Sequence, residues 1–216
     1  MKLVNKAIHA GKSVDSRIVQ GKVHYIDLDQ KVQIANTLGQ NTFDHRIKTR
    51  MLFTMFAEDE KDAQSSYYGP GAMKGLEFYE QIDVEECARK AARDALVLLH
   101  AKPCPIGQMP VVIGNGFGGL FFHEACGHSL EASQVRNNGS EFSGLLGQTV
   151  ASSKVTLVDD GSIPGEWGSL SCDDEGEPTR KNVLIEKGVL KSYLVDRYHA
   201  KILDLKPTGS ARRENY

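Results

Sequence analysis

The sequence has almost no net charge, and this absence weighs against one broad class of function. Its 26 Lys and Arg residues are balanced by 28 Asp and Glu residues, which leaves −2 with neutral histidine. Proteins that bind nucleic acid through its phosphates concentrate positive charge on one surface. The composition therefore gives no support for direct nucleic-acid binding.

The sequence also lacks any Cys-x-x-Cys spacing and any apolar leader after its first residue. Its four cysteines are scattered along the chain, at Cys87, Cys104, Cys126 and Cys172. Scattered thiols without a leader are typical of proteins kept in a reducing compartment. We therefore expect reduced cysteines in a cytoplasmic protein.

A third absence is a long apolar stretch that could form one helix. The segment from Pro103 to Phe122 carries no formal charge and is about as long as the roughly 20 residues of a membrane span. Its three prolines and five glycines break any continuous helix, and a break in lipid would leave backbone groups unpaired. The segment predicts no membrane span, but a loop, a short buried strand over Met109 to Ile113 and a Gly-rich turn.

What the sequence does contain is His-Glu-Ala-Cys-Gly-His, beginning at His123. Neutral imidazoles bind zinc, and a neighbouring carboxylate can deprotonate a metal-bound water. The pattern is similar to the zinc-hydrolase motif His-Glu-x-x-His with one residue added. His123 and His128 are therefore candidate metal ligands, and Glu124 is the candidate general base.

The added residue changes the geometry of the motif. In a regular α-helix, residues five apart are rotated by about 500°, or about 140° after a full turn, so His123 and His128 would face different ways. A wide turn of the π kind brings residues i and i+5 together, and Gly127 offers backbone freedom just before the second histidine. The metal interpretation therefore predicts a distorted helix. The alternative is two partly buried histidines on a regular core helix.

The remaining sequence predicts helices alternating with antiparallel strands. Apolar spacing near 3.6 predicts an amphipathic helix at the start of the chain. Asp83 and Glu86 form a capping pair for the strongest helix, Val84 to His100. Alternating or β-branched runs predict strands at 18–28, 32–35, 47–55, 155–158, 183–185 and 189–194. The first two are expected to join at a turn around residues 29–30, and the last two to form a hairpin around residues 186–188. The fold class is α+β, with an antiparallel or mixed sheet packed with a few helices and the metal-motif helix following the buried strand and Gly-rich turn.

Four weaker signals favour ordinary structural roles. Gly69 to Gly75 predicts a flexible loop, which could be a domain boundary, an active-site flap or a plain surface connection. Gly114 to Gly119 matches G-x-G-x-x-G, but the βαβ unit that a dinucleotide site needs does not follow. The acidic run from Asp173 to Glu177 could hold calcium but lacks the EF-hand spacing, which favours a solvated turn. His199 is expected to be a surface residue near a short helix at 196–203.

These residues resemble the TldD/PmbA family, also called modulators of DNA gyrase, and in particular its TldD branch. The block beginning at His123 is similar to that branch's His-Glu-x-x-x-His motif. Later blocks of the chain are similar to the family too, at 158–161, 173–176, 182–186 and 209–216. The resemblance is strongest over 109–216, and it is weaker but collinear from residue 1.

The resemblance implies a cytoplasmic zinc metallopeptidase that hydrolyses unfolded peptides. It implies a dimer, either with itself or with a sister subunit that lacks the motif, and no membrane association. His123 and His128 would be zinc ligands and Glu124 the general base. The family's third ligand is a cysteine beyond this chain, so the chain resembles the middle portion of a longer protein. Cys172 or His199 could substitute only if the fold brought them close.

Two domain-sized segments and two functions follow from that resemblance. Residues 1–108 resemble the end of the family's N-terminal domain, and residues 109–216 form a β-rich metallopeptidase segment. The leading hypothesis is a zinc peptidase whose metal site is incomplete within this chain. The alternative is a catalytically silent partner or regulatory subunit, which the missing third ligand favours and the intact motif opposes.

Overall fold

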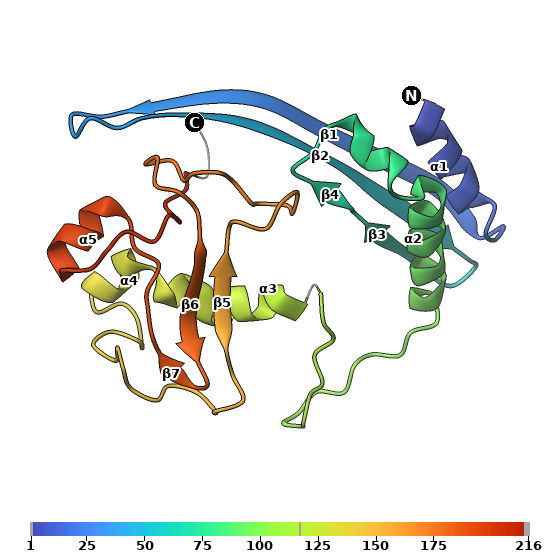
Figure 1. The fold of residues 1–216 in the computed structure, drawn as a ribbon. Coiled ribbons are helices and arrows are strands. Elements are labelled where there is room, and N and C mark those ends of the chain that lie inside the picture. Colours follow the sequence, from blue (N-terminus) through green and yellow to red (C-terminus); the bar gives the residue numbers. More distant parts are fainter. Residues whose placement is uncertain (1, 117, 214–216) are drawn as a thin grey trace. The chain divides into compact units, whose positions relative to one another are not determined.

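A computed structural model describes residues 2–116 and 118–213, which form two compact units. The first contains the residues up to Gln30, His45–Gln108 and Gly165–Gly168. The second contains Lys31–Asp44, Met109–Pro164 and the residues from Ser169 on. Antiparallel strands and several helices confirm the α+β class (Figure 1).

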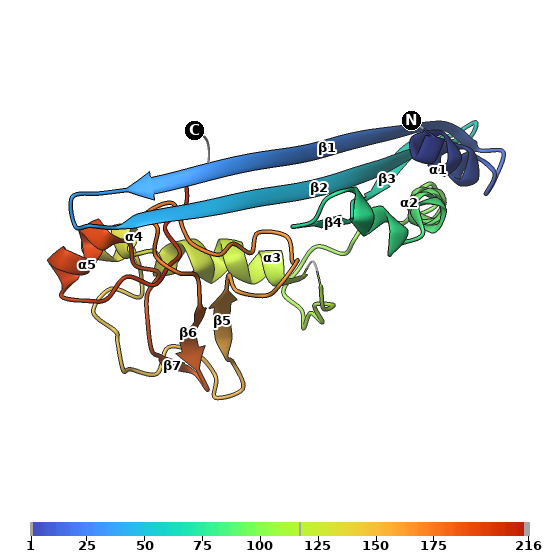
Figure 2. The same cartoon turned by 45° about the horizontal axis from the view of Figure 1, so that its top comes forward.

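Two long strands dominate the first sheet. Strands β1 (Ile18–Ala35) and β2 (Asn41–Glu58) each have 18 residues and lie side by side in both ribbon views (Figures 1 and 2). β3 (Ala63–Tyr68) is antiparallel to β2, and the short β4 (Gly71–Ala72) pairs with β2 at an earlier position. From Thr49 onward, alternate residues of β2 are buried, which confirms the predicted strand with one inward face.

Three helical segments accompany this sheet in the first unit. They are α1 (Lys2–Lys12), the 3₁₀-helix η1 (Leu76–Glu80) and α2 (Val84–Leu98). The Asp83 carboxylate caps α2 by accepting hydrogen bonds from the backbone N–H groups of Glu85 and Glu86, at 2.9 and 3.0 Å. Both the starting helix and the capped helix are therefore confirmed.

Alanines on α2 let the elements of the first unit pack closely. Four of them are fully buried, and α1 packs against α2 while α2 contacts β3. Phe53 and Met55 of β2 fill the same core and are also fully buried. Because small side chains bring the helix backbones near one another, the larger core residues come mainly from the sheet.

The second unit has a smaller sheet and shorter helices. Strands β5 (Leu157–Asp160), β6 (Lys181–Glu186) and β7 (Val189–Leu190) pair antiparallel in that order. A two-residue turn with positive φ at Lys187 and Gly188, 46° and 85°, joins β6 to β7 and confirms the predicted hairpin. The unit also contains α5 (Arg197–Leu203) and the segments of the metal motif.

The acidic run beginning at Asp173 is not a solvated turn. Asp173 is 1% exposed, and its carboxylate accepts hydrogen bonds from the backbone N–H groups of Glu175, Glu177 and Ala211 at 2.9–3.0 Å. This side chain therefore holds its own turn and a distant segment of the chain together. The acidic composition predicted a solvent-exposed turn, because composition does not reveal backbone N–H donors from distant parts of the chain.

Three other expectations about local structure were wrong. The predicted turn at residues 29–30 lies inside the continuous strand β1, because pairing with β2 overrides the local turn preference. The segment predicted as a loop, Gly69 to Gly75, is interrupted by the short strand β4, which pairs with β2. His199 has a side chain only 12% exposed, since it packs beside Asp196 and bonds to that carboxylate at 2.8 Å.

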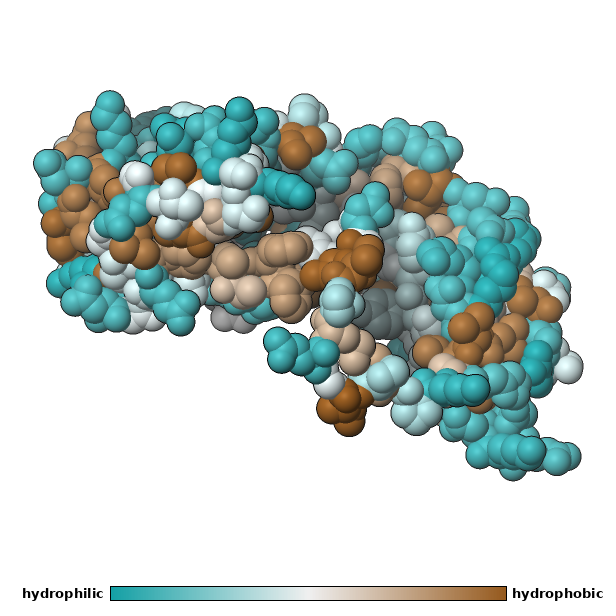
Figure 3. Space-filling model, turned by 90° about the horizontal axis from the view of Figure 1, so that it is seen from below, coloured by the Kyte–Doolittle hydropathy of each residue, from teal (hydrophilic) through white to brown (hydrophobic). Residues whose placement is uncertain are grey.

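The predicted buried strand over Met109 to Ile113 is also wrong. Among the described residues, no strand pairs with this segment, and Val111 and Val112 are 73% and 97% exposed. An apolar run predicts burial only where another element supplies a surface, and Pro110 has no N–H to donate. Exposed apolar residues of this kind appear as brown patches on the surface in Figure 3.

None of the helices in the described ranges combines the length and apolar character needed to cross a bilayer.

Candidate metal centre

The metal motif lies on a chain of short helical segments with a wide turn in the middle. α3 (Gly118–Phe122) leads into a π-helix, η2 (His123–Gly127), and then into the 3₁₀-helix η3 (His128–Leu130) and α4 (Ala132–Arg136). The N–H of His128 donates to the carbonyl oxygen of His123, which is the i+5 to i hydrogen bond of a π turn. The distorted helix predicted from the spacing is therefore confirmed.

The π turn brings the two imidazoles to one side of the segment. Their ring centroids lie 4.6 Å apart, with ring planes at 74°. One potential ligand atom each from His123, Glu124 and His128 lies within 4.8 Å of the other two. This is the arrangement that the metal interpretation required and that a regular helix would not give.

Gly127 does not supply the conformational freedom expected of it. Its φ and ψ are −57° and −54°, ordinary right-handed helical values that any residue adopts. A Cβ at this position would approach the ring of His123 at 3.6 Å, an ordinary contact. The wide turn therefore does not depend on a left-handed glycine.

Two carboxylates flank the ring of His128. The Oε1 atom of Glu131 lies 2.8 Å from Nδ1, and the Oε2 atom of Glu124 lies 3.8 Å from Nε2. The hydrogen bond that the His128 ring donates to Glu131 is the main reason that the pKa of His128 is raised above its ordinary value, with smaller charge effects from Glu131 and Glu124. Sequence reasoning gave Glu131 no role, although its position three residues after a helical histidine was a usable signal.

The donor set fits zinc. Two imidazoles with a carboxylate beside them match the two zinc-binding histidines and the general base of zinc hydrolases. Because Zn–N bonds are about 2.0–2.1 Å, two nitrogens bound to one ion lie no more than about 4 Å apart. The ligand atoms of His123, Glu124 and His128 lie within 4.8 Å of one another, which is slightly wider. All three side chains are exposed, so small rotations can bring their ligand atoms together.

Neither proposed substitute for the third ligand joins this group. Among the described residues, the cluster that could hold a metal contains only His123, Glu124 and His128. Cys172 is 2% exposed in the core of its unit. The ring of His199 is instead held by Asp196.

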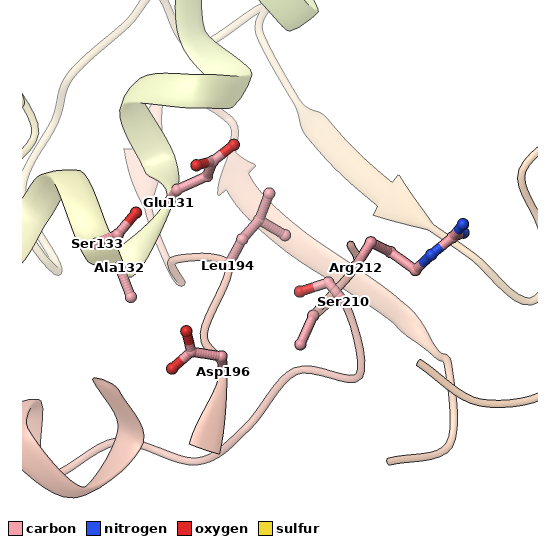
Figure 4. A pocket seen from close by; sticks show the side chains of 8 residues that line it. Glu131, Ala132, Ser133, Leu194, Asp196, Ser210 and Arg212 are labelled. Carbon is pink, nitrogen blue, oxygen red and sulfur yellow. The ribbon is translucent and has the colours of Figure 1, made fainter. Parts of the chain in front are cut away.

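A pocket of about 240 Å³ begins beside the metal motif. Among the residues that line it, Leu194 lies between Glu131 and Asp196 (Figure 4). Ser133 and Ser210 add hydroxyl groups to its wall. Glu131 therefore contributes both to this pocket and to the surroundings of His128.

Two family models match the chain in succession. The PmbA/TldA metallopeptidase central domain matches residues 1–99, and the PmbA/TldA metallopeptidase C-terminal domain matches residues 106–216. The second match contains the whole metal motif.

Curated relatives align along nearly the whole chain. A protein named metalloprotease TldD homolog from Buchnera aphidicola is 34% identical over 221 aligned residues, which cover 99% of this chain and 46% of the relative. Another of that name, from Haemophilus influenzae, is 35% identical and covers 100% and 46%. The chain thus spans about half the length of these relatives.

A solved structure agrees with the fold. A protein from Thermotoga maritima, described as a modulator of a DNA gyrase, superposes with a TM-score of 0.86 at 28% sequence identity. The superposition covers 100% of this chain and 49% of that protein.

Proposed function

Because this chain belongs to the PmbA/TldD metallopeptidase family, we propose that His123 and His128 bind zinc and that Glu124 is the general base of a peptidase. One observation carries this proposal. The π turn gathers two imidazoles and one carboxylate, with ligand atoms within 4.8 Å, in a segment where a regular helix would separate them.

The roles of the three residues follow from their chemistry. Zinc, when bound, supplies a Lewis acid that polarises the scissile carbonyl. Glu124 is 64% exposed on its side chain, so its carboxylate is free to approach a water and take its proton. The imidazoles use their neutral nitrogens to hold the ion and keep it beside that carboxylate.

Catalytic zinc sites have three protein ligands and one open position. The motif supplies two imidazoles, and Glu124 is assigned to proton transfer. The family resemblance supplies a cysteine further along a longer chain as the third ligand. We therefore propose that residues 1–216 hold an incomplete site, and that the division into 1–108 and 109–216 separates a supporting segment from the metallopeptidase segment.

The proposed substrate is unfolded peptide, since a peptide chain must reach the scissile bond in an extended form. The proposed assembly is a homodimer or a heterodimer with a sister subunit that lacks the motif, and the proposed location is the cytoplasm. These proposals rest on the family, whose curated relatives are about twice as long as this chain.

Three variants test the division of roles. His123→Ala should lose zinc binding, measured by competition with a chromophoric chelator, because an imidazole ligand is gone. Glu124→Gln should keep zinc affinity within a few-fold of wild type but abolish peptide hydrolysis, measured on a casein-derived peptide mixture with a full-length family member carrying the same change. Glu141→Ala, an exposed carboxylate of the same unit, is the control and should change neither property. Equal loss of zinc affinity in His123→Ala and Glu124→Gln would contradict the assigned roles.

The alternative function is a silent or regulatory subunit, and the same assay separates it. Only two imidazoles are present in the described cluster, which favours this alternative. If the full-length protein binds zinc no more tightly than its His123→Ala variant and hydrolyses no peptide, the peptidase proposal is wrong and the silent role remains.

A further inference from the structure

The carboxylate of Glu131 lies beside Nδ1, one of the two ring nitrogens of His128. Its Oε1 atom is 2.8 Å from Nδ1, a short hydrogen-bond distance. The other ring nitrogen, Nε2, is the one that lies 3.8 Å from the Glu124 carboxylate. The two nitrogens of this ring therefore face two different carboxylates.

The backbone at Glu131 is fixed by the core of its unit. Leu130 is fully buried, and its carbonyl oxygen accepts from the N–H of Leu194 at 2.9 Å. The N–H of Ala132 donates to the carbonyl oxygen of Leu194 at 2.8 Å. These bonds hold the backbone on both sides of Glu131, so its carboxylate is attached to an anchored position although it is itself 42% exposed.

An ionised carboxylate only accepts hydrogen bonds, so the partner nitrogen must carry the proton. The hydrogen bond to Glu131 therefore selects the form of neutral His128 with hydrogen on Nδ1. That form leaves the lone pair on Nε2, the nitrogen that lies 3.8 Å from the Glu124 carboxylate. His123 has no hydrogen-bonded carboxylate among the described residues, so this effect is specific to His128.

We propose that Glu131 is a positioning residue that holds His128 with Nδ1 protonated and Nε2 free to bind the metal. The effect on zinc rests on the proposed function, whereas the effect on the ring does not. Carboxylate partners of this kind orient metal-binding imidazoles and increase their basicity, and their loss typically weakens metal binding 10–100-fold.

A merely structural role would look different. Surface ion pairs contribute little to folding stability, and both partners here are about half exposed, at 55% and 42%. Replacing Glu131 should therefore leave thermal stability close to that of wild type. The change should appear instead in the proton position on His128 and in zinc affinity.

The first experiment is nitrogen-15 NMR of the metal-free protein labelled at histidine, at a pH well above the imidazole pKa. His128 signals are assigned with His128→Ala. In wild type, His128 should carry its proton on Nδ1, and in Glu131→Ala the proton should move mainly to Nε2. Glu131→Gln should largely keep the wild-type form, because its amide oxygen can accept the same hydrogen bond. A proton on Nε2 in wild type, or an unchanged spectrum in Glu131→Ala, would overturn the proposal.

The second experiment measures zinc affinity by chelator competition. Glu131→Ala should bind zinc 10–100-fold more weakly than wild type, with Glu131→Gln between the two and the control Glu141→Ala unchanged. Equal affinity of wild type and Glu131→Ala would overturn the inference while leaving the proposed zinc site intact. If wild type binds no better than His123→Ala, the proposed function fails, and the NMR result alone then decides the role of Glu131.

Discussion

Replacing Asp173 tests how much of the second unit depends on one buried carboxylate. Its two oxygens accept three backbone hydrogen bonds at 2.9–3.0 Å, and the residue is 1% exposed. A hydrogen bond to a charged group contributes about 1.5–3 kcal/mol, so three at the lower end suggest a loss of about 4.5 kcal/mol in Asp173→Ala. Asp173→Asn keeps one acceptor oxygen but turns an N–H₂ group toward another donor, so we expect a loss of about 2 kcal/mol.

Urea unfolding followed by far-UV circular dichroism measures these losses. Trp167 provides a separate fluorescence signal from the first unit, where its ring lies 5.4 Å from the Lys48 ammonium. Glu141→Ala controls for losing a carboxylate at the surface of the second unit and should change stability by less than about 0.5 kcal/mol. If Asp173→Ala is no more destabilising than this control, the carboxylate does not hold the segment, and the original expectation of a solvated turn was the better one.

Three further changes test local features. Gly188→Ala should lower the free energy of unfolding in urea more than Gly144→Ala does. Both glycines have positive φ, but of the two only Gly188 would place its new Cβ against a backbone carbonyl. Equal losses of stability in the two variants would refute this steric argument. Asp83→Ala should cost about 1 kcal/mol of stability by removing a helix cap, and an unchanged urea midpoint would show that the cap is dispensable. Burial raises the pKa of the Cys87 thiol, so a smaller fraction of Cys87 is thiolate at neutral pH. Cys87 should therefore react with a chromogenic disulfide more slowly than the exposed Cys104. The opposite order of rates in single-cysteine variants would contradict this.

The metal motif was predictable because its spacing admits few solutions. Two imidazoles five residues apart on a helix can share an ion only if the helix widens between them, so the metal interpretation of His123 and His128 predicted a π turn before any fold was known. The cap at Asp83 and the turn at Gly188 were predictable for a similar reason. Each depends on neighbours within a few residues, and local sequence contains those neighbours.

The errors occurred where distant partners decide the outcome. The turn expected within β1 disappears because β2 supplies a continuous partner strand. Asp173 is buried because the N–H of Ala211, 38 residues away, reaches its carboxylate. Val112 was expected in a buried strand, yet no described strand pairs with it. A single sequence indicates the preferences of its residues, but it does not show which distant segments of the chain will pair with or pack against them.

The wide turn at His123–Gly127 also relates two lengths of the same motif. Deleting either Ala125 or Cys126 would set the histidines four residues apart, the spacing at which an ordinary α-helix places two side chains on one face. The motif of this chain, His-Glu-x-x-x-His, and the shorter motif His-Glu-x-x-His thus differ by one codon and can present the same imidazole pair. An alignment of this chain with a protein of the shorter motif should therefore place its gap inside the bulge and keep both histidines in register.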